Sequence, residues 1–238
     1  MPEIKMRLAL NLFALSLGLA LLPAVVLFSG WHWQVAAMAD QAPAWLWLTL
    51  SGSFPMAIMT SLLVLAWLKW RLGWSWRTTG LHGLCLACAL VAGQGVKGVL
   101  KHSFQEPRPY VQYLDQQHQG QFYHLDSLAQ ERLIDAAPIP GWLKGHWRAE
   151  RGYSLPSGHT QFAVTLALFA IVLFWRARAW LSGALMLAWA LAMMASRLVL
   201  GMHWPLDLLL SLSFSWLLVW PALAVSQSGR QLGKISDQ

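Results

Sequence analysis

The sequence predicts an all-α integral membrane protein with six transmembrane helices. Of its 238 residues, 57% are hydrophobic and only 11% are charged, a balance too apolar for an ordinary soluble domain. Apolar runs close to the roughly 20 residues that cross a bilayer recur along the whole chain. Many of the 16 Trp residues fall near the expected helix ends, where an aromatic belt forms at a membrane surface. We therefore expect a single membrane-embedded domain over residues 1–238.

The candidate spans are six apolar segments separated by polar connections. The first follows Lys5 and Arg7, as a signal peptide would. Its apolar run exceeds the roughly 7–15 residues of a cleaved signal, so a retained helix is expected. The second is short and follows an apolar stretch over residues 43–50, which either lies at the interface or extends the span. The six segments are residues 8–29, 54–70, 79–101, 159–175, 179–199 and 204–225.

The net charge of +7 is explained by orientation in a membrane rather than by binding to nucleic acid. Basic residues concentrate in loops on the cytoplasmic side of membrane proteins. By this rule both termini are cytoplasmic, and the connections over 31–53, 102–158 and 200–203 lie on the opposite side. The basic residues that set this orientation are Lys5, Arg7, Lys69, Arg71, Arg77, Arg176, Arg178, Arg230 and Lys234.

The long connection over residues 102–158 is expected to be a helical insertion on the non-cytoplasmic side. Residues 126–137 are rich in helix formers and carry apolar side chains at helical spacing, and Pro138 ends the pattern. The charged residues of this helix are expected to form a solvated face with no catalytic role. Beyond it, Trp142 and Trp147 are expected to turn back toward the lipid.

Polar side chains at the non-cytoplasmic helix ends are the best guide to function, because a charge at bilayer depth costs about 2.5–3.5 kcal/mol on insertion scales. The first cluster closes the third segment, where Lys97 and Lys101 share a helix face close to Gln94. Arg108 follows between two prolines that stop a helix. The alternative for either lysine is simple snorkelling toward the interface.

The second cluster is the sequence from Pro156 to His159, directly before the fourth segment. Ser157 is a preferred N-cap, and Gly158 lets an anion approach the backbone closely. A helix N-terminus of this kind is a ready phosphate site. The alternative is a capped helix with an incidental histidine.

The third cluster joins the fifth and sixth segments and begins with Ser196 and Arg197. Pro205 suits a first helical position, which puts Asp207 in the first turn near His203. A carboxylate beside an imidazole fixes its tautomer and stabilises positive charge that develops on the ring. The alternative is a salt bridge between Arg197 and Asp207, which leaves His203 without a purpose.

The three clusters match, in order and spacing, the signature of the type 2 phosphatidic acid phosphatase superfamily. That signature reads K-x6-R-P, P-S-G-H and S-R-x5-H-x3-D, and here it runs from Lys101 to Asp207 without a departure. The chain therefore resembles this superfamily. Within it, the chain is most similar to the bacterial phosphatidylglycerophosphatase B group through the stretches GQGVK, QEPRP, PSGHT and GMHWPLD.

The resemblance implies a metal-independent lipid phosphatase of the bacterial inner membrane, with its active site facing the periplasm. It implies hydrolysis of the phosphomonoester of phosphatidylglycerol phosphate, and of undecaprenyl diphosphate, phosphatidic acid and related lipids. His203 is then the nucleophile that forms a phosphohistidine, oriented by Asp207, and His159 is the general acid. The residues expected to hold phosphate are Lys101, Arg108, Ser157, Gly158 and Arg197, with Lys97 and Gln94 outside the signature as possible headgroup contacts.

Three alternatives to this function stay open. Two belong to the same superfamily: a dedicated undecaprenyl diphosphate phosphatase, and a phosphotransferase that passes the phosphoryl group from one lipid to another. A transporter or channel is more remote, because it requires polar residues that continue through the bilayer, whereas the helix interiors here are apolar. No metal, cofactor or protein partner is implied, and the partners expected are the lipid substrate and the surrounding membrane.

Overall fold

The computed structural model of the protein describes residues 2–38, 43–118 and 121–236, and this part of the chain is helical throughout, without a strand. The side chains of Lys5, Arg230 and Lys234, which contribute to the expected orientation, lie outside the described residues. The elements are α1 (Pro2–Phe28), η1 (Val35–Met38), α2 (Ala44–Leu50), α3 (Met56–Leu72), α4 (Trp76–Phe104), α5 (Pro109–His118), η2 (Phe122–His124), α6 (Ser127–Ala136), α7 (Gly141–Ala149), α8 (Gly158–Arg176), α9 (Trp180–Val199) and α10 (Pro205–Ser236).

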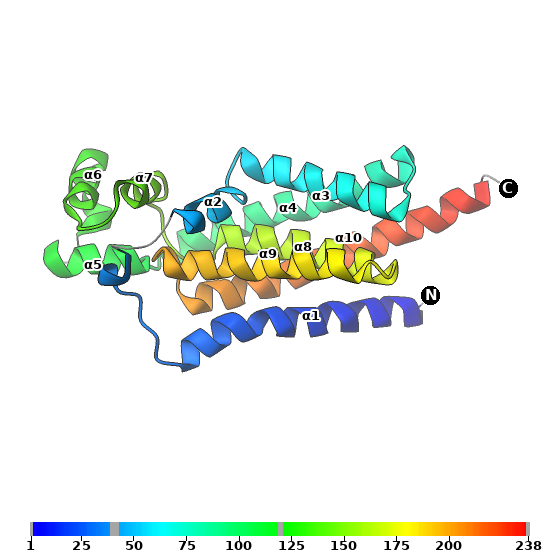
Figure 1. The fold of residues 1–238 in the computed structure, drawn as a ribbon, viewed down its shortest axis with the longest axis horizontal. Helices are drawn as coiled ribbons and strands as arrows, with labels where there is room; N and C mark the ends of the chain where they lie inside the picture. Colours follow the sequence, from blue (N-terminus) through cyan, green and yellow to red (C-terminus); the bar gives the residue numbers. More distant parts are fainter. Residues whose placement is uncertain (1, 39–42, 119–120, 237–238) are drawn as a thin grey trace.

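The elements form an elongated bundle with a helical cap at one end (Figure 1). We call α1, α3, α4, α8, α9 and α10 the bundle, since they run along its length, and α5, α6 and α7 the cap. Both chain ends lie at the end of the bundle opposite the cap. The short helix α2 lies where the bundle meets the cap and packs against α9.

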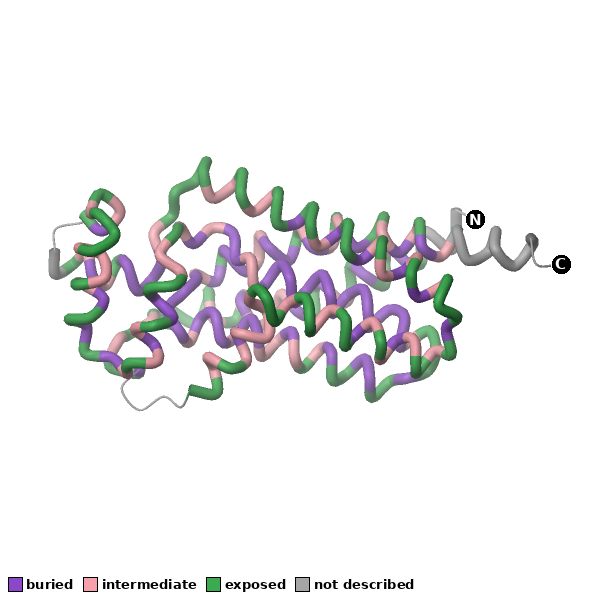
Figure 2. The backbone as a smooth tube through the Cα atoms, turned by 90° about the horizontal axis from the view of Figure 1, so that it is seen from above, coloured by how far each residue is buried: buried purple, intermediate pink, exposed green. Residues whose placement is uncertain are grey.

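Helix α8 is the centre of the bundle, and its sequence explains why. Every residue from Thr160 to Phe174 is buried, and none of them is charged. A helix that is apolar on all sides is stable only when other elements surround it. Helices α1, α3, α4, α9 and α10 all pack against α8, which leaves the exposed positions to the outer helices (Figure 2). On α1, for example, Leu21, Val25 and Phe28 are 65%, 64% and 86% exposed, a surface suited to lipid.

Five described stretches are long and apolar enough to cross a membrane. Each corresponds to one of the expected spans: Met6–Phe28, Trp76–Gln116, Gly158–Arg176, Trp180–Val199 and Pro205–Gln227. Helix α3, which corresponds to the expected span over 54–70, has 17 residues and is not one of the five. An all-helical membrane protein is therefore supported, while the count of six spans stays a prediction.

The insertion holds three helices where the sequence indicated one. The helix expected over 126–137 is α6, whose N-cap Asp126 accepts a hydrogen bond from the Ala129 backbone N–H at 2.8 Å. Helices α5 and α7 were not expected. Trp147 on α7 was expected near the lipid, and that was wrong. Its ring is fully buried and stacks on Tyr110 of α5 with the ring centroids 4.4 Å apart.

Candidate active site

The three polar clusters meet where the bundle joins the cap, because each lies at a helix end. Lys101 is in the last turn of α4, and Arg108 directly precedes α5. His159 follows the N-cap of α8, and Arg197 is in the last turn of α9. The connection after α9 carries His203, and the first turn of α10 carries Asp207. Four helices of the bundle thus bring together residues that are far apart in the chain.

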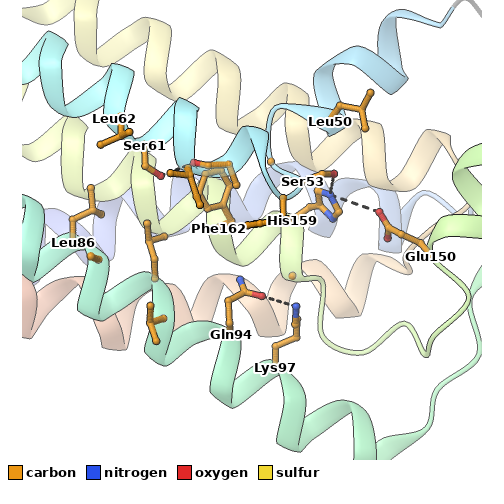
Figure 3. Close-up of a pocket in the computed structure, with 18 of the residues that line it drawn as sticks. Leu50, Ser53, Ser61, Leu62, Leu86, Gln94, Lys97, Glu150, His159 and Phe162 are labelled. Carbon is orange, nitrogen blue, oxygen red and sulfur yellow. Dashed lines mark hydrogen bonds and ion pairs between the residues drawn. The ribbon is translucent and has the colours of Figure 1, made fainter.

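A cavity of about 860 Å³ opens at this junction and extends between α3 and α4. Seven of the expected site residues line it: Gln94, Lys97, Lys101, Arg108, Gly158, His159 and His203. Figure 3 shows that Gln94 and Lys97 lie across the cavity from His159. Ser157, Arg197 and Asp207 are buried behind this wall and are not part of the lining.

His203 and Asp207 form a buried pair. The Nδ1 atom of His203 lies 3.1 Å from Oδ2 of Asp207, which also accepts the Trp204 backbone N–H at 2.9 Å. Burial, followed by the positive charges of Arg108 and Arg197, holds the pKa of His203 well below its usual 6.5. A neutral ring that donates Nδ1–H to a carboxylate keeps its lone pair on Nε2. An imidazole in this state can act as a nucleophile.

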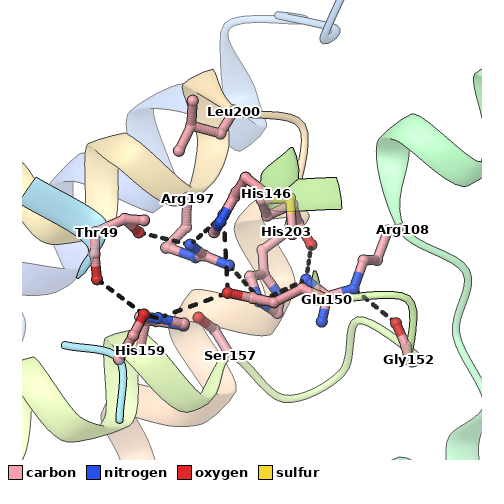
Figure 4. A network of polar contacts seen from close by, with 12 residues as sticks. Thr49, Arg108, His146, Glu150, Gly152, Ser157, His159, Arg197, Leu200 and His203 are labelled. Atoms are coloured by element: carbon pink, nitrogen blue, oxygen red, sulfur yellow. Dashed lines mark hydrogen bonds and ion pairs between the residues drawn. The ribbon is translucent and has the colours of Figure 1, made fainter. Parts of the chain in front are cut away.

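Glu150, which the sequence did not reveal as a site residue, lies at the centre of the polar network (Figure 4). Its Oε2 accepts a hydrogen bond from Arg197 Nη2 at 2.8 Å and one from Arg108 Nη1 at 3.3 Å. Its Oε1 lies 3.7 Å from Nε2 of both His146 and His159. Burial alone raises the pKa of Glu150, but the charges of Arg197 and His159 outweigh burial and lower it, so the carboxylate is ionised.

Helix α7 places Glu150 in the network together with His146. The two residues are four apart, and His146 Nε2 is 3.3 Å from Arg197 Nη1, from which it accepts a hydrogen bond. Burial and then the charge of Arg197 lower the pKa of His146 to about 4, so the ring is neutral. In the sequence this pair looks like a solvated helix face. The only signal was that Glu150 comes six residues before Pro156, the start of the PSGH cluster.

The three cations expected to hold phosphate are themselves held by the protein. Arg197 is fully buried, and its Nη1 donates to Thr49 Oγ1 at 2.5 Å. The alternative bridge from Arg197 to Asp207 is wrong, since Glu150 is the ion-pair partner of Arg197. Arg108 Nε donates to the Gly152 carbonyl at 2.6 Å, and Lys101 Nζ donates to the Tyr153 carbonyl.

The start of α8 is shaped by Ser157 and Gly158. Ser157 is the N-cap, as its residue type predicts, and its Oγ accepts the Thr160 N–H at 3.3 Å. A Cβ on Gly158 would lie 2.7 Å from Cδ of Lys97, which is too close for a real contact. Glycine therefore lets Lys97 cross the helix start and reach Gln94 Oε1 at 2.5 Å.

Two further polar contacts come from the segment around α2, which sequence reasoning did not connect with the site. Thr49 meets Arg197, and Ser53 Oγ lies 2.8 Å from Nε2 of His159. No motif distinguishes these residues from other serines and threonines at helix ends. Among the described residues, no group of three His, Cys, Asp or Glu side chains is arranged to hold a metal ion.

The comparisons with known proteins agree with this geometry. The family model described as PAP2 superfamily matches residues 82–230, more than half of the chain, so the protein belongs to the PAP2 superfamily. It is 38% identical over 217 residues to phosphatidylglycerophosphatase B of Escherichia coli (strain K12), covering 88% of this chain and 85% of the relative. It is 32% identical over 227 residues to the phosphatidylglycerophosphatase B of Haemophilus influenzae (strain ATCC 51907 / DSM 11121 / KW20 / Rd), covering 85% and 90%. The protein is a lipid phosphatase of this superfamily.

Proposed function

We propose that the enzyme removes the terminal phosphate of phosphatidylglycerol phosphate and that His203 is the nucleophile. The observation that carries the proposal is the buried His203–Asp207 pair at the wall of a cavity that Lys101, Arg108 and His159 also line. The substrate is taken from the relatives, which are named phosphatidylglycerophosphatase B. Undecaprenyl diphosphate, phosphatidic acid and related lipid phosphates are proposed as further substrates of the same site.

In the first step, Nε2 of His203 attacks phosphorus in line with the lipid oxygen. The N–P bond forms as the P–O bond to the lipid breaks, and His159, which starts as the protonated imidazolium, gives its proton to the departing oxygen and becomes neutral. The hydrogen on Nδ1 of His203 stays on the ring and remains hydrogen-bonded to Asp207. The carboxylate of Asp207 balances the positive charge that the ring acquires. In the second step, water attacks the phosphorus of the phosphohistidine, and the neutral His159 takes a proton from that water. The N–P bond breaks, which frees His203 and releases inorganic phosphate.

The positive groups stabilise the phosphoryl oxygens during both steps. Lys101 and Arg108 line the cavity, whereas Arg197 lies behind Glu150. In the structure, the carboxylate of Glu150 neutralises both Arg108 and Arg197. An incoming phosphate dianion therefore competes with Glu150 for the N–H groups of these two arginines. Lys97, with Gln94, is proposed to contact the headgroup or a second phosphate, as in a lipid diphosphate.

The apolar part of the cavity is proposed to hold a lipid tail. Away from the polar end it is lined by Ile58, Leu62 and Leu65 of α3 and by Leu86 and Leu90 of α4. Ile58 and Leu62 are 53% and 60% exposed, and such an apolar surface on α3 is suited to the bilayer. We therefore propose that α3 is the sixth span.

The orientation in the membrane follows from six spans. An even number of crossings puts both chain ends on one side, as their common end of the bundle requires (Figure 1). Basic residues such as Lys69 and Arg71 at the end of α3 favour the cytoplasm for that side. The protein is thus proposed to lie in the bacterial inner membrane, with the site and the cap facing the periplasm.

The test uses purified protein in detergent and phosphatidylglycerol phosphate labelled in its terminal phosphate. We expect labelled free phosphate and, after quenching in alkali where phosphohistidine survives, label on the protein. Both signals should disappear in His203→Ala. Label that moves to a second lipid instead of water would show a phosphotransferase, and phosphate release without labelled protein would contradict the histidine intermediate. Undecaprenyl diphosphate and phosphatidic acid, tested in parallel, give the substrate range.

A further inference from the structure

The connection between α2 and α3 touches the proposed general acid, although it lies outside the superfamily signature. Ser53 Oγ is 2.8 Å from Nε2 of His159 and lines the cavity beside it (Figure 3). Ser53 is half-buried, and its own backbone is fixed on both sides: its N–H donates to the Leu50 carbonyl at 3.0 Å, and its carbonyl accepts the Ala57 N–H at 2.8 Å. The serine is therefore held in place by the turn that joins the two helices.

Gly52 shows that this turn is fitted closely to the histidine. A Cβ on Gly52 would lie 3.3 Å from Cδ2 of His159 and 3.0 Å from Cε of Met193. Both distances are tighter than most real Cβ contacts. The backbone beside Ser53 thus passes close to the imidazole ring, and a side chain at residue 52 would have to press against His159 and Met193.

The hydrogen-bond partners determine where the proton of His159 resides. Glu150 Oε1 is 3.7 Å from the same Nε2 atom, and an ionised carboxylate can only accept hydrogen bonds. The hydroxyl of Ser53 has an acceptor for its own hydrogen in the Thr49 carbonyl at 3.4 Å, which leaves its oxygen free to accept from His159. Both partners therefore favour a hydrogen on Nε2 and disfavour a bare lone pair there.

We infer that Ser53 is a positioning residue for the general acid, and that its hydroxyl holds the Nε2–H of His159 at the cavity wall where the leaving oxygen of the lipid phosphate arrives. The inference rests on the proposed function, in which His159 protonates that oxygen. His159 starts as the protonated imidazolium, so when the P–O bond breaks, its Nε2–H bond breaks as well, the proton goes to the lipid oxygen and the ring is left neutral. Ser53 is not consumed and forms no covalent bond.

The test compares two substrates that differ in their need for a proton. The alcohol of a lipid phosphomonoester leaves as an unstable alkoxide unless its oxygen is protonated, whereas a 4-alkyl-2-nitrophenyl phosphate releases a stable nitrophenolate. We expect Ser53→Ala to lower kcat on the lipid phosphate by about 10–100-fold and to change kcat on the aryl phosphate by less than about threefold. Ser53→Thr keeps the hydroxyl and should restore most of the lipid activity.

Ser51→Ala is the matched control. Ser51 lies on the same turn and is also half-buried, but its Oγ contacts Trp189 and the Leu48 carbonyl instead of His159. It should leave both activities near those of the unmodified enzyme. A substitution that merely disturbs the turn would lower kcat on both substrates together, and the same loss would appear in Ser51→Ala.

Separate outcomes distinguish the inference from the proposed function. Equal loss on both substrates in Ser53→Ala, or no loss on either, overturns the role of Ser53. If His159→Ala nevertheless lowers kcat on the lipid phosphate far more than kcat on the aryl phosphate, the general acid stands and only the Ser53 inference has failed. Equal loss on both substrates in His159→Ala removes the general acid, and the role of Ser53 falls with it.

Discussion

The bundle and the cap are packed as separate hydrophobic units and contribute different groups to one site. The bundle core is built around α8, and its helix ends carry His159, His203 and Asp207, the residues proposed to move protons and bind phosphorus. The second core forms around Trp147 in the cap, which carries His146 and leads directly into Glu150, the partner of two buried arginines. Reactivity and charge compensation are thus assigned to different parts of the molecule.

The largest expected effect follows from removing the nucleophile on the bundle. His203→Ala should lower kcat for lipid phosphate by roughly 10⁴-fold or more, because it removes the group that is proposed to form the covalent intermediate. The control is His124→Ala, which replaces an exposed histidine on η2 in the insertion and should leave kcat unchanged. Phosphate release by the two purified variants checks this. Substantial activity in His203→Ala would contradict the assignment of the reactive group to the bundle.

The pH dependence tests how charges beside the cap act on the bundle. His203 reacts in its neutral form, so a lowered pKa keeps it reactive to more acidic pH, and activity is lost only as the pH falls through that lowered pKa. Arg108→Gln removes one of the charges that lower it, so the acid limb of kcat/KM should move up toward pH 6.5.

The reference for this pH shift is Arg148→Gln, which removes a charge that is paired with Asp135 at the surface of the cap. Its acid limb should coincide with that of the unmodified enzyme. The substrate ionises identically in all three measurements, so the difference between profiles belongs to the protein. An acid limb that stays in place in Arg108→Gln would mean that Arg108 does not control His203.

A smaller effect is expected from the cap carboxylate, measured as stability. Glu150→Gln leaves two buried arginines without their negative partner, which should lower the free energy of unfolding by about 3 kcal/mol. Glu131→Gln breaks a pair with Arg151 in which Glu131 is 40% exposed, and it should cost less than about 1 kcal/mol. Denaturant unfolding in detergent compares the two variants. Equal losses would show that the Glu150 network adds no stability beyond a surface ion pair.

The smallest effect is expected from chelation. The positive charge that neutralises the phosphoryl oxygens is proposed to come from Lys101, Arg108 and Arg197, so excess EDTA should leave phosphate release unchanged. A magnesium-dependent phosphatase in the same detergent shows that the chelator works. Activity that collapses with EDTA and returns with added metal would assign this role to an ion instead of the three side chains.

The sequence predicted the bundle much better than the cap, and the reason is physical. A long apolar run has few ways to avoid water, so the expected span over 159–175 agrees with α8 over Gly158–Arg176. The short helices α5 and α7 owe their stability to the second core, in which Trp147 meets Tyr110 and Leu200. Tyr110 and Leu200 are distant from Trp147 in the sequence, so no local sequence pattern predicts these contacts.

The same contrast applies to the site. The signature marks residues whose chemistry and spacing are distinctive, and the structure brings Lys101, Arg108, His159 and His203 to one cavity. It does not mark Glu150 or Ser53, which look like ordinary polar residues until the helices that carry them are placed. Partners that act through three-dimensional contact alone need the fold before they can be recognised.

The cavity between α3 and α4 also bears on which measure of substrate concentration sets the reaction rate. With a lipid tail in the part of the cavity lined by Leu62 and Leu86, as proposed above, the enzyme meets its substrate within a two-dimensional layer of lipid or detergent. Reaction velocity then depends on the surface mole fraction of substrate instead of its bulk molarity. Adding inert detergent at constant lipid phosphate dilutes that surface and slows turnover, although the tube contains as much substrate as before.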